Sequence, residues 1–254
     1  MNFVDWAGLA MAAFAAALLQ AAGGFGFAII AVPLFLIVVE PQRAVQLVII
    51  LSTVLCLAVL PGLWRATAPR LFVRLTLGSL AGLPLGLVAF RYADPRAVRL
   101  IVGTAILVFA LLLALMRQRH GGGRALVAMT AGRDLATGAV SGIATSLAGI
   151  SGPPIVIYLL LTEAPPRTLR ATLIAYFALA YALTLAANIA TIGVPAQTWL
   201  AAGILIPFAV AGGLVGRPLG DRLGAAAFAA LATGVLAAAG LYILFTAAFA
   251  AAKL

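Results

Sequence analysis

The sequence predicts an all-α polytopic membrane protein made of two inverted repeats, each a broken, re-entrant hairpin segment followed by three transmembrane helices. Three observations support this fold class. Hydrophobic residues make up 65% of the chain and charged residues only 9%, a composition far from that of soluble domains. Long uncharged stretches recur, and short segments that hold the arginines separate them. Glycines interrupt two of these stretches at corresponding places in the two halves.

The uncharged stretches predict the helices. A helix needs about 20 apolar residues to cross a hydrocarbon core of about 30 Å. Six stretches meet this length as ordinary spans, which we place at residues 44–63, 71–90, 98–116, 170–193, 197–216 and 223–252. Two further runs, 6–39 and 135–162, would measure about 51 Å and about 42 Å as single straight helices, so the chain must turn inside each of them.

The two halves match at glycines, prolines and arginines, with an offset that drifts slowly from 124 to 131 residues. The matched pairs are Pro41 with Pro165, Arg43 with Arg167, Gly82 with Gly212, Gly86 with Gly216, and Gly103 with Gly234. We therefore expect a first repeat at 1–116 with its broken segment at 6–39, and a second repeat at 134–254 with its broken segment at 134–162. A basic, glycine-rich linker at 117–133 separates them.

The basic residues favour one way of threading the membrane. If each broken segment crosses once, the 16 Lys and Arg residues divide equally between the two sides. If each broken segment enters and returns on the same side, they divide 11 against 5, as the positive-inside rule requires. The second threading leaves three crossings per repeat, an odd number, and therefore inverts one repeat relative to the other.

The breaks themselves indicate a binding site. Non-helical backbone at membrane depth survives only where it is buried in protein or lines a polar cavity. Interrupted segments at corresponding positions of inverted repeats are typical of the midplane site of secondary transporters. Each break would present a half-helix N-terminus, which favours anions, so we expect residues 23–26 and 149–152 to form one shared anion site. The alternative is that the glycines only permit close helix packing, which is the preferred interpretation for the two GxxxG motifs.

Two segments carry a resemblance to a known family. GGFGFAIIAVPLF at residues 23–35 and GISGPPIVIYLL at residues 149–160, with a GxxxG helix late in each half, resemble the TauE/SafE family of sulfite exporters, also called the 4-toluene sulfonate uptake permeases. The resemblance covers essentially the whole chain. It implies a multi-pass transporter of the bacterial inner membrane that exports sulfite, sulfonates or similar small anions, with proton coupling as an option. It does not distinguish these substrates from a non-sulfur carboxylate, nor a carrier from a passive anion channel.

The candidate substrate-binding residues lie at or near the breaks. Gln20, Ser146 and Ser151 can donate to sulfonate oxygens. Arg170 lies one helical turn beyond Arg167 and can add a cation, although it can equally snorkel to lipid headgroups. Asn188 shares a helix face with Tyr181, or forms a hydrogen bond between helices. The full set is Gln20, Gly23, Gly24, Phe25, Gly26, Ser146, Gly149, Ile150, Ser151, Gly152, Pro153, Arg170 and Asn188.

The composition also excludes several classes of function. The net charge of +10 comes from arginines between uncharged segments, so we expect a lipid bilayer and no nucleic acid as partner. A single cysteine, Cys56, and a single histidine, His120, cannot build a four-ligand metal site. No cluster places a nucleophile beside a base. We therefore expect no enzyme, no cofactor and no metal, and a protein that works as a monomer or homodimer on a small anionic substrate.

Acidic residues are scarce in the predicted spans. No Asp or Glu lies deep in an unbroken span, so the usual intramembrane carboxylate relay for protons is not expected. Glu40 and Glu163 end the two broken segments. We expect them to pair with nearby arginines at the surface, with proton sensing as the alternative.

Overall fold

The computed structural model describes residues 2–23, 26–118, 129–160, 162, 165–222, 234, 238, 240–242 and 245. Over these residues the chain is helical and contains no β-strand. The α-helices are α1 (Phe3–Gly23), α2 (Phe27–Val38), α3 (Pro41–Val59), α4 (Pro69–Tyr92), α5 (Pro95–Gln118), α6 (Ala131–Ala148), α7 (Gly152–Leu160), α8 (Pro166–Thr191) and α9 (Ala196–Arg222). Two short 3₁₀ helices, η1 (Leu60–Gly62) and η2 (Trp64–Ala66), lie between α3 and α4.

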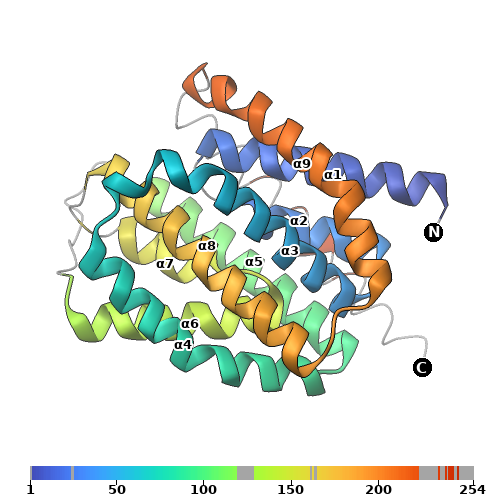
Figure 1. Ribbon diagram of the computed structural model, residues 1–254, viewed down its shortest axis with the longest axis horizontal. Coiled ribbons are helices and arrows are strands. Elements are labelled where there is room, and N and C mark those ends of the chain that lie inside the picture. The colour runs from blue at the N-terminus through green and yellow to red at the C-terminus, as the bar shows by residue number, and fades with distance from the viewer. Residues whose placement is uncertain are drawn as a thin grey trace. The chain divides into compact units, whose positions relative to one another are not determined.

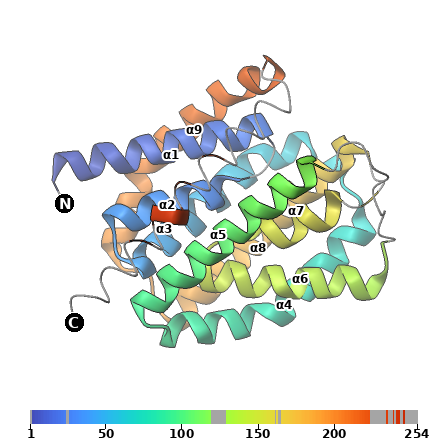
Figure 2. The same ribbon diagram turned by 180° about the vertical axis from the view of Figure 1, so that it is seen from behind.

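Both overlong runs break at the predicted glycines. Only three residues separate α1 from α2, and three separate α6 from α7. The helices of each pair contact one another, so the second helix folds back along the first, as Figure 1 and Figure 2 show for α1 and α2. The expectation that the chain turns inside each run is confirmed.

The two arms of each broken segment differ in length. α1 has 21 residues and α2 has 12, or about 32 Å and about 18 Å. α6 has 18 residues and α7 has 9, or about 27 Å and about 14 Å. Each segment is therefore one long arm and one short arm rather than two equal half-helices. Its re-entry on one side of the membrane stays a prediction.

Five helices of the described part of the chain are long and apolar enough to cross a membrane. They are Phe3–Ala21, Pro41–Gly62, Pro69–Tyr92, Arg167–Thr191 and Ala196–Gly216. The last four correspond to the spans expected at 44–63, 71–90, 170–193 and 197–216, and α5 is a helix over the span expected at 98–116. Most of the span expected at 223–252 and of the linker at 117–133 lies outside the described residues.

The chain forms two compact units, which are described separately. Unit 1 comprises residues 1–45, 93–123 and 203–254, and unit 2 comprises residues 46–92 and 124–202. Each unit takes segments from both halves of the sequence. The units are therefore not the two sequence repeats, and the assignment of those repeats stays a prediction.

Glycines bring two helices of unit 2 into direct backbone contact. Gly82 and Gly86 of α4 leave no room for a Cβ, because the carbonyl oxygens of Ala139 and Ile143 on α6 occupy that space. α6 contributes glycines of its own at Gly138, which lies against the backbone of α4 at Leu75, and at Gly142, which lies against Ser79. α4 and α6 consequently run side by side along their length (Figure 1 and Figure 2).

Unit 1 contains the matching contact. Gly212 and Gly216 of α9 lie against the carbonyl oxygens of Phe14 and Leu18 on α1. These glycines follow Gly82 and Gly86 by 130 residues, and the residues they contact precede Ala139 and Ile143 by 125 residues. In both units, the GxxxG helix of one half packs on the long arm of the other half. The expectation that the two GxxxG motifs serve close helix packing is confirmed.

The first prediction concerns this packing. Replacing Gly138 with Val puts a side chain into the backbone of α4, and we expect a loss of at least about 1–3 kcal/mol of stability. Gly132 lies on the same helix with nothing within 4 Å of an added Cβ, so Gly132→Val should leave the thermal unfolding temperature in detergent unchanged. Equal unfolding temperatures for the two variants would contradict the close contact.

The second prediction tests the hairpin. Asn2 and Glu40 are both exposed and flank the folded-back pair α1 and α2, so single cysteines at these positions in a Cys56→Ala background should label from the same face of sealed vesicles. Trp64 follows α3 and is 52% exposed, and Trp64→Cys should label from the opposite face. Labelling of positions 2 and 40 from opposite faces would rule out the re-entrant threading.

Candidate functional site

Unit 2 contains a group of buried hydroxyl side chains beside the second break. They come from α3, α4, α6, α8 and the break itself, and each is at most 4% exposed. We call them the hydroxyl cluster, which consists of Ser52, Ser79, Ser141, Ser151, Tyr176 and Tyr181. All six are uncharged hydrogen-bonding groups within largely apolar helices.

Two members of the cluster satisfy the backbone that the break exposes. The Ser141 hydroxyl donates to the carbonyl oxygen of Ser151 at 2.6 Å. The Tyr181 hydroxyl accepts from the Ser151 N–H and donates to the Gly149 carbonyl oxygen, both at 3.3 Å. Since Ser141 has one hydroxyl proton, the Ser151 hydroxyl is the donor in the 3.1 Å contact between the two serine oxygens. The Ser151 N–H and the carbonyl oxygens of Gly149 and Ser151 are thus paired within the protein, as backbone groups buried away from water require.

Glycine makes each turn possible. Gly149 ends α6 with φ 69°, and its N–H donates to the carbonyl oxygens of Ala144 and Thr145. Gly26 precedes α2 with φ 117°. Side chains other than glycine rarely adopt such backbone conformations, so these two predicted site residues are needed for the turns themselves.

Two hydroxyl groups of the cluster have no hydrogen-bond partner in the part of the chain that the structure describes. They belong to Ser52 and Tyr176, which are 1% and 0% exposed. The Tyr176 hydroxyl lies near the hydroxyls of Ser79, Ser141 and Ser151, but none of these contacts has the distance and angles of a full hydrogen bond. The hydroxyls of Ser52 and Tyr181 are likewise close without a well-formed hydrogen bond. An unpaired buried hydroxyl costs about 1–3 kcal/mol, so the cluster holds two donors that a bound molecule would satisfy.

The helix N-terminus at this break offers few backbone donors. α7 begins at Gly152 and continues with Pro153 and Pro154, which have no N–H groups. The N–H of Ser151 is already donated to Tyr181. Among the first three residues of α7, only Gly152 has an N–H group, so the hydroxyl groups must provide most of the donors for a ligand.

The remaining predicted residues of unit 2 lie in different surroundings. Ser146 is buried, but its hydroxyl donates to Gly142 of its own helix at 2.8 Å. Asn188 is buried and donates to the Thr184 carbonyl oxygen, also within its own helix. Ile150 is buried in the break. Arg170 is exposed in the second turn of α8, so the structure does not bring it to the hydroxyl cluster.

The predicted residues of the first break belong to unit 1. Gln20 is half-buried on α1, and Gly23 ends that helix. Gly24 and Phe25 lie outside the described residues. One shared anion site made by both breaks stays a prediction, because the two breaks belong to different units.

Sequence reasoning missed three members of the cluster, Ser52, Ser79 and Ser141. Single serines in apolar spans are common and carry no periodic signal. Tyr176 and Tyr181 were visible only as polar residues within a span.

Asp134 holds the open end of the second hairpin together and links it to α4. Asp134, 1% exposed, accepts a hydrogen bond from the Tyr158 hydroxyl at 2.6 Å and pairs with Arg74 of α4 at 3.2 Å. Asp134 lies two turns before Ser141 on α6, and Tyr158 lies two turns after Ser151. The Asp134–Tyr158 and Ser141–Ser151 hydrogen bonds together fix the antiparallel register of α6 and α7.

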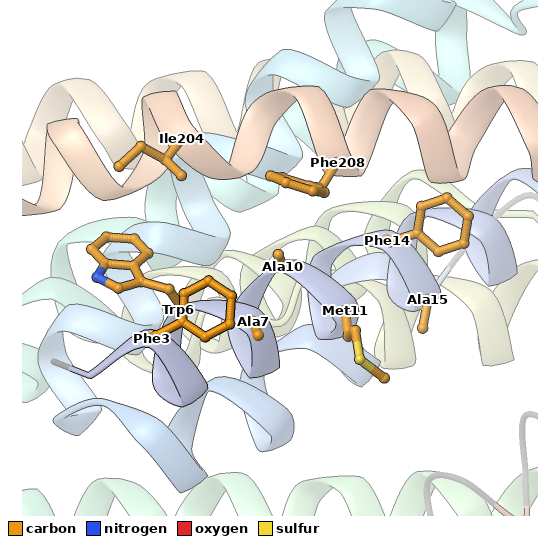
Figure 3. Close-up of a pocket in the computed structure, with 9 residues that line it drawn as sticks. All are labelled: Phe3, Trp6, Ala7, Ala10, Met11, Phe14, Ala15, Ile204 and Phe208. Atoms are coloured by element: carbon orange, nitrogen blue, oxygen red, sulfur yellow. The ribbon is translucent and has the colours of Figure 1, made fainter.

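A groove in unit 1 has a different character. About 570 Å³ in volume, it is lined by apolar side chains of α1 and α9, and Ile204 and Phe208 project from α9 toward α1 (Figure 3). The only polar side-chain atom in its lining is the indole nitrogen of Trp6. Such a lining suits a lipid acyl chain rather than an oxyanion.

The third prediction concerns the ion pair. Arg74→Ala leaves the buried Asp134 without its cation, and we expect a loss of about 1–3 kcal/mol in stability. Arg70 is exposed one turn earlier on the same helix, and Arg70→Ala should change stability by less than about 0.5 kcal/mol. Thermal unfolding of the two variants in the same detergent makes the comparison. An unaffected Arg74→Ala protein would mean that the ion pair does not stabilise the contact between α4 and α6.

Comparison with known proteins identifies the family. Neither a curated protein nor a solved structure matches the chain. The family model described as sulfite exporter TauE/SafE matches residues 9–243, nearly the whole length, and confirms the resemblance noted in the sequence. Members of this family are transporters and not enzymes. The chain therefore belongs to the sulfite exporter TauE/SafE family, and is a multi-pass membrane protein of a family that transports sulfite and sulfonate-type anions.

Proposed function

We propose that this protein is a secondary transporter in the inner membrane of a bacterium, and that it exports small sulfur-containing oxyanions of the sulfite and sulfonate class. Its family supports the substrate class and the direction. The hydroxyl cluster is the proposed binding site, and its six residues lie within one chain. A second copy is therefore not needed to complete the site, and both a monomer and a homodimer fit this proposal.

The observation that carries the proposal is the pair of unpartnered hydroxyls, Ser52 and Tyr176, next to a break in the helical backbone. An anion that leaves water at membrane depth loses its hydration, so the site must replace water with hydrogen-bond donors. The cluster provides such donors among apolar helices.

Export of an anion needs no coupled ion. The membrane potential, negative inside, favours the outward movement of a negative charge by about 2.3 kcal/mol per 100 mV. The buried carboxylate of Asp134 is engaged by Arg74 and Tyr158, and Glu40 is exposed at the end of α2. The proposal is therefore potential-driven export, and the competing mechanism is coupling to protons.

The fourth prediction tests this function in proteoliposomes. We expect uptake of labelled sulfite to saturate with concentration, to be inhibited by methanesulfonate, and to follow an imposed membrane potential more strongly than an imposed pH gradient. Liposomes without protein are the control. Flux that rises linearly without saturation would indicate a passive channel, and preferential uptake of a carboxylate or of a cation would overturn the substrate class.

A further inference from the structure

The hydroxyl cluster contains hydrogen-bond donors but no positive charge. All six members are Ser or Tyr. Arg74 is paired with Asp134 at the open end of the hairpin, and Asp134 lies about 10 Å from Ser141 along α6, two helical turns away. Arg170 is exposed on the second turn of α8. A ligand in the cluster would therefore be held by neutral groups.

Few of these neutral groups remain available for a ligand. The hydroxyl protons of Ser141, Ser151 and Tyr181 are already used within the break. The hydroxyls of Ser52 and Tyr176 are fully enclosed and have no described partner. The Ser79 hydroxyl lies beside that of Tyr176, and Gly152, which follows Ser151 in the chain, adds an N–H. A sulfonate group has three oxygens that can accept hydrogen bonds from such donors.

The number of charges on the ligand then decides whether binding is favourable. The cost of moving an ion out of water rises with the square of its charge, so a second negative charge raises the cost about fourfold. A hydrogen bond to a charged group contributes only about 1.5–3 kcal/mol. A few neutral donors can therefore offset the cost of burying one negative charge far better than the cost of burying two negative charges.

We propose that the hydroxyl cluster selects singly charged oxyanions, namely sulfonates and hydrogen sulfite, and discriminates against doubly charged ones such as sulfate. Ser52 and Tyr176 are the residues that determine this selectivity. The inference rests on the proposed function, because it names the charge state of the anion that the same site accepts.

The fifth prediction uses two probes of similar size, methanesulfonate and sulfate, with the full-length protein in detergent. Isothermal titration or a thermal-shift series at constant ionic strength should give methanesulfonate a dissociation constant at least about tenfold lower than that of sulfate. Equal binding, or tighter binding of sulfate, would overturn the selectivity while leaving the transport function standing, provided that the proteoliposomes show saturable anion flux. Absence of both binding and flux for every anion would overturn the proposed function as well.

Variants that remove the two unpaired hydroxyls test whether Ser52 and Tyr176 bind the ligand. Tyr176→Phe and Ser52→Ala should each weaken methanesulfonate binding by about tenfold or more, because each removes a donor to a charged oxygen. In the absence of ligand, neither variant should lower the unfolding temperature, since the hydroxyl that is removed had no partner. Weaker methanesulfonate binding together with an unchanged unfolding temperature would show that these hydroxyls bind the ligand and do not stabilise the fold.

Thr53 provides the matched control. It is the neighbour of Ser52 on α3, it is also buried, and its hydroxyl donates to the Ile49 carbonyl oxygen of its own helix at 2.7 Å. Thr53→Val should leave methanesulfonate affinity unchanged. Unchanged affinity in both Ser52→Ala and Tyr176→Phe would remove these hydroxyls from the site, and a lower unfolding temperature in ligand-free protein would assign them a structural role instead.

Discussion

Backbone groups at membrane depth must find partners inside the protein, and the arrangement of unit 2 depends on this constraint. The chain leaves the helix at residues 149–151, so carbonyl and N–H groups there lose their helical partners. Tyr181 and Ser141 replace those partners. Because these side chains come from α8 and α6, the break can exist only where both helices lie against it.

The glycine contact between α4 and α6 serves the same site. Gly138 and Gly142 let the two backbones touch at Leu75 and Ser79. With side chains in place of these glycines, the helices would stand further apart, and Ser79 could not lie beside Ser141 and Tyr176. Close helix packing and the polar cluster are therefore two results of one arrangement, whereas the sequence suggested two unrelated roles for glycine.

Much of the fold could be predicted, because its signals are local or periodic. The breaks follow from apolar runs that are too long for one helix, and the GxxxG contacts follow from spacing alone. The residues of the candidate site were harder to predict from the sequence. A single serine such as Ser52 has no sequence signature, and its importance arises only when the fold places it beside Tyr181. Asp134 follows an arginine-rich linker and gave no sign that it would be 1% exposed. Arg170 was favoured for its charge, and only the structure shows that it is exposed.

Neutral donors suit a protein that must release what it binds. A transport site has to bind strongly enough for the substrate to enter and weakly enough for it to leave. A buried arginine would hold an oxyanion through paired, charge-assisted hydrogen bonds, and a tightly bound anion would leave slowly. The two unpaired hydroxyls cost the empty protein about 1–3 kcal/mol each, which raises the energy of the state without ligand. The site can therefore attract an anion through the relief of this cost, and can still release it because the hydroxyl cluster contains no arginine to hold the anion in place.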